Sequence, residues 1–218
     1  MLEFEQDFYI GSFDIDTPNK QIEALFAKIL QEREEQASGY YALPFSNRAL
    51  QDCEEFIQSR KKILKNLKNL VIIGIGGSSL GLKAIDCLLR HKPHKNTQRH
   101  DSRPNLIFLE HTDALMIPHL LTNCKRKNTL FIAISKSGTT IETSSLLKYV
   151  INEFNLLQSH KTKKHLAIIT DVDSALARFA KEKDIAHITI APNIGGRFSV
   201  LSAVGILPLI LLGYDTYA

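Results

Sequence analysis

The stretch Thr129-Leu-Phe-Ile-Ala-Ile-Ser-Lys-Ser-Gly-Thr-Thr140 joins an apolar run to a cluster of hydroxyl groups around one lysine. Residues 129–134 are short, apolar and partly β-branched, which is typical of a strand buried on both faces of a parallel sheet. From Thr139 onward the apolar residues recur at helical spacing, at Leu146, Leu147, Val150, Ile151 and Phe154. The sequence therefore predicts a strand, a polar loop and a helix that begins beside the hydroxyls.

The polar loop is a candidate phosphate site. The first turn of a helix presents unpaired backbone N–H groups and the positive end of the helix dipole. To these the loop adds four hydroxyl donors and one full positive charge, from Ser135, Ser137, Thr139, Thr140 and Lys136. The alternative is an ordinary helix N-cap, which needs one hydroxyl and no ligand. Because the loop supplies more donors than a cap uses, we favour a dianionic phosphate as its ligand.

Short apolar runs alternate with helical segments along the rest of the chain. The runs lie at residues 71–75, 106–109, 130–134, 166–169 and 185–190. This pattern predicts an α/β fold with a five-stranded parallel, doubly wound sheet. We expect residues 1–68 to form an N-terminal helical segment and residues 69–218 to form the α/β domain. Ligands of such sheets bind beyond the carboxyl ends of the strands.

Two helices are predicted before the sheet. Thr17 and Pro18 resemble an N-cap followed by proline, and an apolar stripe then continues to about Gln36. Ser46 is the expected N-cap of the second helix. The apolar face of that helix is made of Leu50, Cys53, Ile57, Leu64 and Leu67.

Composition limits the possible partners and location. The chain has 218 residues, a net charge of +4 and three basic runs that do not interleave aromatic residues, so we expect no nucleic-acid partner. The longest apolar stretch, residues 200–212, is shorter than the roughly 20 residues that a membrane span needs. The acidic N-terminus and three scattered cysteines indicate reduced thiols and a cytoplasmic location. Histidines in the polar segment 91–104 lack metal-ligand spacing, and we expect a mobile surface loop there and no metal.

The loop after the first apolar run, Val71-Ile-Ile-Gly-Ile-Gly-Gly-Ser-Ser-Leu-Gly81, is rich in glycine. A dinucleotide fingerprint that starts at Gly74 would need glycine where Ser79 stands, and a P-loop would need lysine where Leu82 stands. Glu110, after the second run, is an acid of the kind that binds ribose, but it lies far beyond the usual spacing of about 20 residues. We therefore expect no nucleotide cofactor.

The same glycine loop suits a polyhydroxylated ligand. Gly76 and Gly77 permit a close approach of the backbone, and the Ser78 hydroxyl is expected to face the ligand. The alternative is a tight turn that only packs helix against strand. That alternative leaves Ser78 and Ser79 without a role.

A third loop, Ala191-Pro-Asn-Ile-Gly-Gly-Arg-Phe-Ser199, follows the fifth run. Arg197 is the only charged residue between Asp184 and Asp215. Its planar donors could hold a ligand oxygen or stabilise developing negative charge. Pairing of Arg197 with Asp171 or another carboxylate is an equally open interpretation.

The helix expected at residues 199–212 is apolar on nearly every side. Such a helix must be covered all round. Because only six residues, Gly-Tyr-Asp-Thr-Tyr-Ala, follow Leu212, we expect a further domain or a partner to supply part of the cover.

The segments VIIGIGGSSLG, ISKSGTTIET and GGRFSVLSAVGILPL, in this order and spacing, resemble the amino-terminal half of the glucose-6-phosphate isomerase family. The resemblance covers roughly residues 40–218. It implies a phosphosugar-binding domain of the SIS type and a homodimeric isomerase without metal or organic cofactor. The implied substrates are glucose 6-phosphate and fructose 6-phosphate, in glycolysis and gluconeogenesis.

The resemblance also implies roles for individual residues. The phosphate would be held by Ser135, Lys136, Ser137 and Thr140. Substrate contacts would come from Gly77, Ser78, Gly196 and Arg197, with Arg197 stabilising the enediolate. Glu142 matches a family position near the histidine that opens the sugar ring and could orient it.

The general base of the family, that histidine and a late lysine come from segments downstream of the matched region. We therefore expect residues 1–218 to bind phosphosugar but to have little or no isomerase activity. A non-catalytic sugar-phosphate sensor or regulatory module on the same fold remains an alternative. A nucleotide-dependent enzyme is a second alternative.

Overall fold

Five short apolar segments form one parallel sheet in the computed structural model, which describes residues 16–90 and 103–216. In chain order the strands are β1 (Asn69–Ile73), β2 (Asn105–Leu109), β3 (Thr129–Ser135), β4 (Leu166–Asp171) and β5 (Ala186–Ile190). Every neighbouring pair is parallel, and the spatial order is β2-β1-β3-β4-β5. The expected α/β fold is therefore confirmed.

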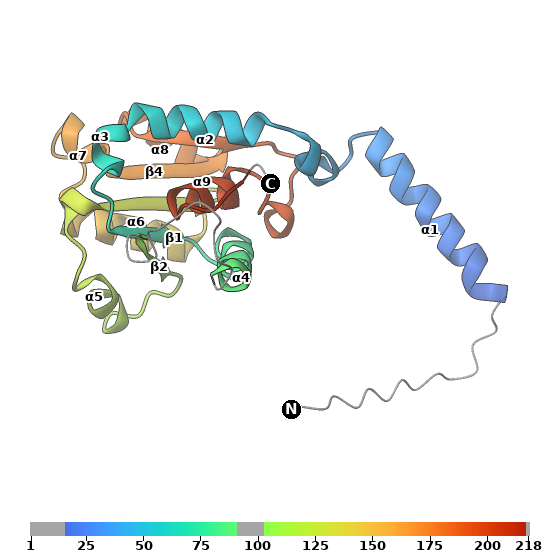
Figure 1. The fold of residues 1–218 in the computed structure, drawn as a ribbon, viewed down its shortest axis with the longest axis horizontal. Coiled ribbons are helices and arrows are strands. Elements are labelled where there is room, and N and C mark those ends of the chain that lie inside the picture. The colour runs from blue at the N-terminus through green and yellow to red at the C-terminus, as the bar shows by residue number, and fades with distance from the viewer. Residues whose placement is uncertain (1–15, 91–102, 217–218) are drawn as a thin grey trace. The chain divides into compact units, whose positions relative to one another are not determined.

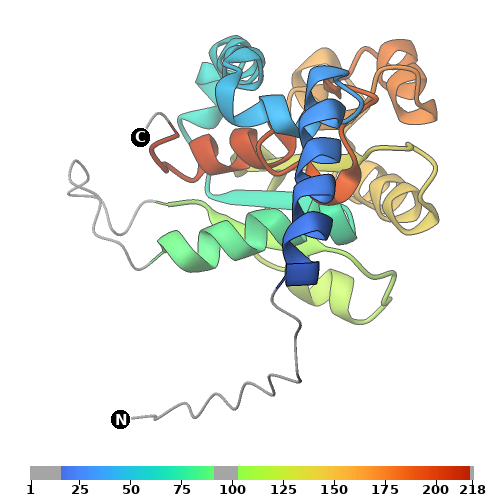
Figure 2. The same cartoon turned by 90° about the vertical axis from the view of Figure 1, so that its right-hand side faces the viewer.

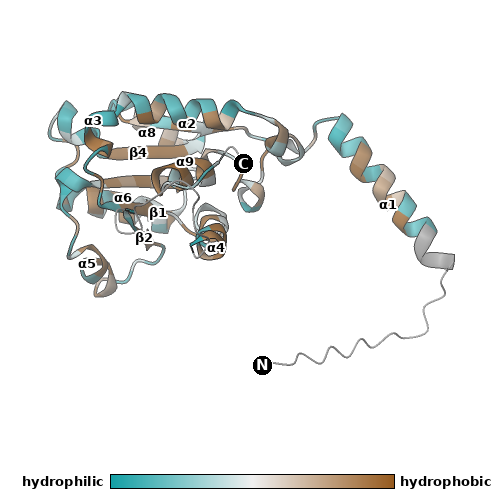
Figure 3. Ribbon diagram, viewed as in Figure 1, coloured by the Kyte–Doolittle hydropathy of each residue, from teal (hydrophilic) through white to brown (hydrophobic). Residues whose placement is uncertain are grey.

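The strands alternate their side chains between two hydrophobic cores, one on each face of the sheet. Leu70 and Ile72 of β1 belong to one core, and Val71 and Ile73 belong to the other. All four side chains are fully buried. Burial on both faces explains the uninterrupted apolar runs in the sequence, which Figure 3 shows as brown strands.

Helices cover both faces of the sheet (Figures 1 and 2). The core on one face includes α2 (Arg48–Ser59), α4 (Leu80–Leu89) and α9 (Ala203–Leu211). The core on the other includes α5 (Met116–Leu121), α6 (Ile141–Glu153) and α8 (Ala175–Glu182). Short helices α3 (Lys61–Leu64) and α7 (His160–Lys163) precede β1 and β4. The helix after β1 and the helix after β3 thus pack on opposite faces, as in a doubly wound sheet.

The chain divides into two compact units, residues 1–39 and 40–218. The first contains α1 (Asp16–Glu34), the first helix that the sequence predicts. α2 belongs to the second unit, where Cys53 and Phe56 are buried in the core. The predicted boundary between residues 68 and 69 stays a prediction. Most of the loop predicted at residues 91–104 lies outside the described residues.

The second predicted helix begins later than expected and is interrupted. Its N-cap is Asn47, while the Ser46 hydroxyl accepts the Arg48 N–H at 3.3 Å. Arg60, at φ −121°, separates α2 from α3. Its guanidinium lies 4.3 Å from the centre of the Phe56 ring. Periodicity did not indicate this break because the apolar residues keep helical spacing on both sides of it.

This chain covers most of α9, but Ile206, Ile210 and Leu211 stay partly exposed, so the expectation that a further domain or a partner adds cover stays a prediction. Val204, Leu207 and Leu209 are at most 5% exposed. The helix packs against α2, α4 and β5 of the same unit. This cover comes from helices far earlier in the chain and not from the six residues that follow Leu212. Among the described residues, no helix is long and apolar enough to cross a membrane.

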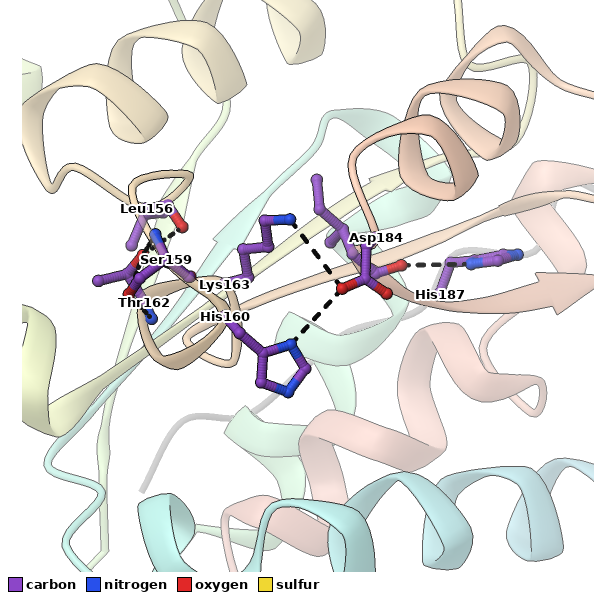
Figure 4. Close-up of polar contacts among 8 residues, drawn as sticks. Leu156, Ser159, His160, Thr162, Lys163, Asp184 and His187 are labelled. Carbon is purple, nitrogen blue, oxygen red and sulfur yellow. Dashed lines mark hydrogen bonds and ion pairs between the residues drawn. The ribbon is translucent and has the colours of Figure 1, made fainter.

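A polar cluster, in which His160 and Asp184 are exposed, lies at the amino ends of β4 and β5 (Figure 4). Ser159 and Thr162 form a capping box at α7. Asp184, at φ 54°, precedes β5, and its carboxylate lies 3.5 Å from His160 Nδ1 and 4.0 Å from Lys163 Nζ. Exposed pairs of this kind contribute at most about 1 kcal/mol. This end of the sheet is opposite to the loops that carry the three motifs.

A buried polar cluster fastens the segment after α9 to α4. The Tyr214 hydroxyl donates to Asp86 Oδ1 at 2.7 Å, and Arg90 pairs with the other carboxylate oxygen. The Arg103 guanidinium lies 4.7 Å from the centre of the Tyr214 ring. Burial, together with the hydrogen bond to Asp86, raises the pKa of Tyr214 to about 12.

Replacing Tyr214 by phenylalanine removes this donor. At neutral pH we expect the free energy of unfolding to fall by about 1.5 to 3 kcal/mol, the usual contribution of a hydrogen bond to a charged group. The raised pKa means that the contribution is complete below pH 10.0, the ordinary pKa of tyrosine, and is lost as the pH approaches about 12.

Urea unfolding of the wild-type chain and Tyr214→Phe at a series of pH values measures this contribution. The difference in unfolding free energy between the two proteins should shrink above pH 10.0. A difference that stays constant across that range would contradict the assignment.

Candidate functional site

A cavity of about 340 Å³ lies beyond the carboxyl ends of β1, β3 and β4. It is lined by Ile75, Gly77, Ser78, Ser135, Lys136, Ser137, Thr140, Thr143, Asp171 and Gly196. β1 and β3 are neighbours in the sheet, and the order of strands reverses between them. The cavity therefore occupies the switch point at which parallel α/β sheets bind ligands.

The loop of residues 135–140, which we call the cup, forms the floor of this cavity. Within the cup, the Gly138 N–H donates to the Ser135 hydroxyl at 3.2 Å, and the Thr139 N–H donates to the Ser137 hydroxyl at 3.3 Å. Ser135 Oγ lies 3.2 Å from Thr140 Oγ1. The hydroxyls are thus arranged by one another and by the backbone.

The N-terminus of α6 lies at the cup and has no side-chain cap. Thr140 is its N-cap residue but makes no capping hydrogen bond. The ordinary N-cap interpretation of the loop is therefore not what the structure shows. An uncapped first turn with its helix dipole is suited to an anion. Thr139 is exposed and not among the lining residues, since its hydroxyl donates to Ser137 at 3.1 Å.

Residues at the end of β4 and at the start of α8 support the cup. The Thr170 hydroxyl donates to the Ser135 carbonyl at 2.6 Å and lies 2.7 Å from Ser174 Oγ. Ser174 in turn accepts the Ala177 N–H at 2.9 Å and caps α8. Gly138 has φ 68°, and a Cβ on it would lie 2.7 Å from the Leu176 nitrogen. The cup therefore depends on a left-handed glycine packed against the start of α8.

The glycine loop after β1 approaches the third loop closely. A Cβ on Gly77 would overlap the Gly196 carbonyl, so the two loops touch through their backbones. Ser78 lines the cavity as the sequence predicts. The structure gives Ser79 a different role, because its buried hydroxyl donates to Glu110 Oε1 at 2.5 Å.

The Glu110 carboxylate makes its contacts with two residues near the start of α4. It pairs with Lys83 in addition to Ser79. Burial opposes the charged carboxylate, but the hydrogen bonds from Lys83 and Ser79 outweigh it and hold the pKa of Glu110 below its ordinary value. Glu110, which in the sequence is an acid of the kind that binds ribose, thus connects the end of β2 to α4.

Arg197 follows the lining residue Gly196 but is not itself among the lining residues, and its side chain is exposed. Within residues 16–90 and 103–216 its guanidinium forms no hydrogen bond or ion pair, so pairing with Asp171 is not observed. The Asp171 carboxylate accepts the Val172 N–H at 2.8 Å instead. The guanidinium therefore remains available to a ligand.

Lys136 lines the cavity, and its expected contact with a phosphate stays a prediction. Its ammonium donates to the carbonyl oxygens of Pro192 at 2.5 Å and Ile194 at 2.7 Å. It therefore contacts the third loop. Glu142 lies half-buried in the first turn of α6 and is not among the lining residues.

Sequence reasoning missed Ile75, Thr143 and Asp171 in the lining. Thr143 follows Thr140 by three residues, so helical spacing could have placed it on the same face of α6. Asp171 was considered only as a partner for Arg197. The described part of the chain contains no group of three His, Cys, Asp or Glu residues that could hold a metal ion.

Residues 38–218 match the family model described as phosphoglucose isomerase. Glucose-6-phosphate isomerase of Campylobacter jejuni is 39% identical over 181 residues, which are 83% of this chain and 42% of that protein. The enzyme of the same name from Acholeplasma laidlawii is 38% identical over 164 residues, which are 73% of this chain and 37% of that protein.

Two solved structures are similar in fold. A hypothetical protein from Thermus thermophilus has a TM-score of 0.77 at 28% identity, and the match covers 92% of this chain and 46% of that one. A glucose-6-phosphate isomerase from Chlamydia trachomatis has a TM-score of 0.62 at 23% identity, and the match covers 74% of this chain and 29% of that one. The chain spans less than half the length of each of these relatives.

Gly138→Ala tests the geometry of the cup, with Gly76→Ala as its matched control. Both glycines have positive φ, 68° and 64°, but a Cβ on Gly76 would meet nothing within 4 Å. The control should lose about 1 to 2 kcal/mol of stability, the cost of the left-handed backbone alone. Gly138→Ala should lose more, because the Cβ also overlaps the Leu176 backbone. Equal losses in chemical unfolding would show that the cup is not packed against the start of α8.

Proposed function

The chain belongs to the phosphoglucose isomerase family, and we propose that residues 1–218 form the phosphosugar-binding part of a glucose-6-phosphate isomerase. The observation that supports this most directly is the cavity at the switch point. It brings together residues from all three motifs, although these lie far apart in the sequence. The proposed reaction interconverts glucose 6-phosphate and fructose 6-phosphate in the cytoplasm, as part of glycolysis and gluconeogenesis.

In this proposal the phosphate lies in the cup. Ser135, Ser137 and Thr140 offer hydroxyls, and the uncapped first turn of α6 offers N–H groups. The sugar then extends toward Gly77, Ser78 and Gly196, which line the opposite part of the cavity. Binding the phosphate remote from the reacting carbons supplies energy for orienting them.

Arg197 is the proposed catalytic residue of this chain. Proton transfer between neighbouring carbons of a sugar passes through an enediolate, whose negative charge a guanidinium can stabilise. The Arg197 side chain is available for this because no described residue pairs with it. Glu142, at the start of α6, is proposed to orient the ring-opening histidine of the family.

In this proposal, the groups that transfer the proton belong to a part of the family enzymes that residues 1–218 do not match. Residues 1–218 by themselves should therefore bind phosphosugar with little or no turnover. The active enzyme is proposed to be a homodimer. An isomerase assay on purified residues 1–218 that gave turnover comparable with a complete family enzyme would overturn this division of roles.

Calorimetric titration of residues 1–218 tests the proposed ligand. Fructose 6-phosphate should bind, whereas fructose and NAD should not. Thr140→Val should weaken binding of fructose 6-phosphate roughly 10- to 100-fold, because it removes a hydrogen bond to a charged group.

Ser145→Ala is the matched control for this titration. Ser145 is exposed on the same helix and does not line the cavity. Its variant should bind as the wild-type chain does. Binding of NAD in preference to fructose 6-phosphate, or an equal effect of the two variants, would argue against the proposal.

A further inference from the structure

The ammonium group of Lys136 joins two loops that come from different strands. Lys136 is the first residue after β3, in the cup. Its Nζ donates to the Pro192 carbonyl at 2.5 Å and to the Ile194 carbonyl at 2.7 Å. Within the described ranges the ammonium forms no ion pair with a carboxylate. Two of its donors are therefore committed to backbone oxygens of the loop after β5.

That loop leads directly to Arg197. Ile194 is buried, and its N–H donates to the Ala191 carbonyl at 3.0 Å. Three residues later the Arg197 side chain leaves the loop into solvent. Since no described partner holds the guanidinium, its position depends on where the backbone of the loop lies.

The end of the loop is held by two other contacts. The Ser199 hydroxyl donates to the Gly196 carbonyl at 2.7 Å, and the Gly77 backbone packs against the same group. The start of the loop is held to the cup by Lys136. Without the ammonium, the Pro192 and Ile194 carbonyls would lose charge-assisted hydrogen bonds that neutral side chains cannot replace.

We propose that Lys136 is a positioning residue, whose ammonium fixes the Arg197 loop at a set distance from the phosphate cup. This inference rests on the proposed function, in which a phosphosugar bridges the cup and Arg197. The two ends of such a ligand are a fixed number of bonds apart. Its phosphate and its reacting carbons meet their partners together only if the loops keep their separation.

The alternative is that the ammonium neutralises the phosphate directly. The two roles differ in which ligands should bind more weakly when the Lys136 ammonium is removed. A direct contact matters for every phosphate, including inorganic phosphate. A positioning contact matters only for ligands long enough to reach Arg197.

Hydrogen exchange of residues 1–218 without ligand measures the tie itself. Lys136→Met keeps most of the side-chain stem and removes the donors. We expect amide exchange in residues 193–199 to become at least about tenfold faster, while β1 and β3 are unchanged. Lys148→Met removes an exposed lysine of α6 and should leave all of these segments unchanged. Unaltered exchange of residues 193–199 in Lys136→Met would overturn the inference.

Calorimetry with two probes then separates positioning from direct contact. Inorganic phosphate fills the cup alone, and 6-phosphogluconate carries a carboxylate at the far end that Arg197 can meet. Lys136→Met should lower the affinity for 6-phosphogluconate at least about tenfold and the affinity for inorganic phosphate less than about threefold. In an Arg197→Met background the same change should have little further effect. An equal loss of affinity for both probes would indicate that the ammonium contacts the phosphate directly, and would overturn the proposal.

Lys136→Arg provides a second variant if Lys136→Met does not fold. It keeps the positive charge but replaces the compact ammonium by a planar guanidinium. If Lys136 is a positioning residue, this variant should bind 6-phosphogluconate more weakly and inorganic phosphate with unchanged affinity. Unchanged affinity for both probes would contradict the proposal. Failure of the wild-type chain to bind either probe would instead contradict the proposed function, since hydrogen exchange reports the Lys136 tie without any ligand.

Discussion

The site depends on one constraint of the parallel sheet, the divergence of the chain after β1 and β3. These strands are hydrogen-bonded neighbours, yet the helices that follow them pack on opposite faces. The loops must therefore separate at the carboxyl edge, and a crevice opens between them. The cup and the glycine loop are the two sides of that crevice. The third loop closes it through the backbone contact of Gly196 with Gly77.

The polar groups around the crevice divide into those that hold the loops and those left for a ligand. Thr170, Ser174 and Ser79 make internal hydrogen bonds that fix the loops in place. Lys136 ties the cup to the third loop. Arg197 and the uncapped first turn of α6 are left for a ligand. This division favours a ligand with a phosphate at one end and a carbon that develops negative charge at the other.

Much of the fold was readable from the sequence because its signals are local. A run such as Leu70 to Ile73 is short and apolar at every position, as a strand buried on both faces requires. Strand order, the pairing of Ser79 with Glu110 and the contact of Lys136 with the third loop join distant segments, so no local pattern reports them. The packing of α9 against α2 and α4 likewise joins distant segments. Thr143 was missed although its helical spacing from Thr140 offered a signal.

The central claim is that the cavity at the switch point holds the phosphate end of a phosphosugar. A crystal structure of residues 1–218 with fructose 6-phosphate measures this directly. The phosphate oxygens should lie within hydrogen-bonding distance of the Ser135, Ser137 and Thr140 hydroxyls, with the sugar carbons directed toward Gly196. A phosphosugar bound with its phosphate outside residues 135–140 would contradict the account.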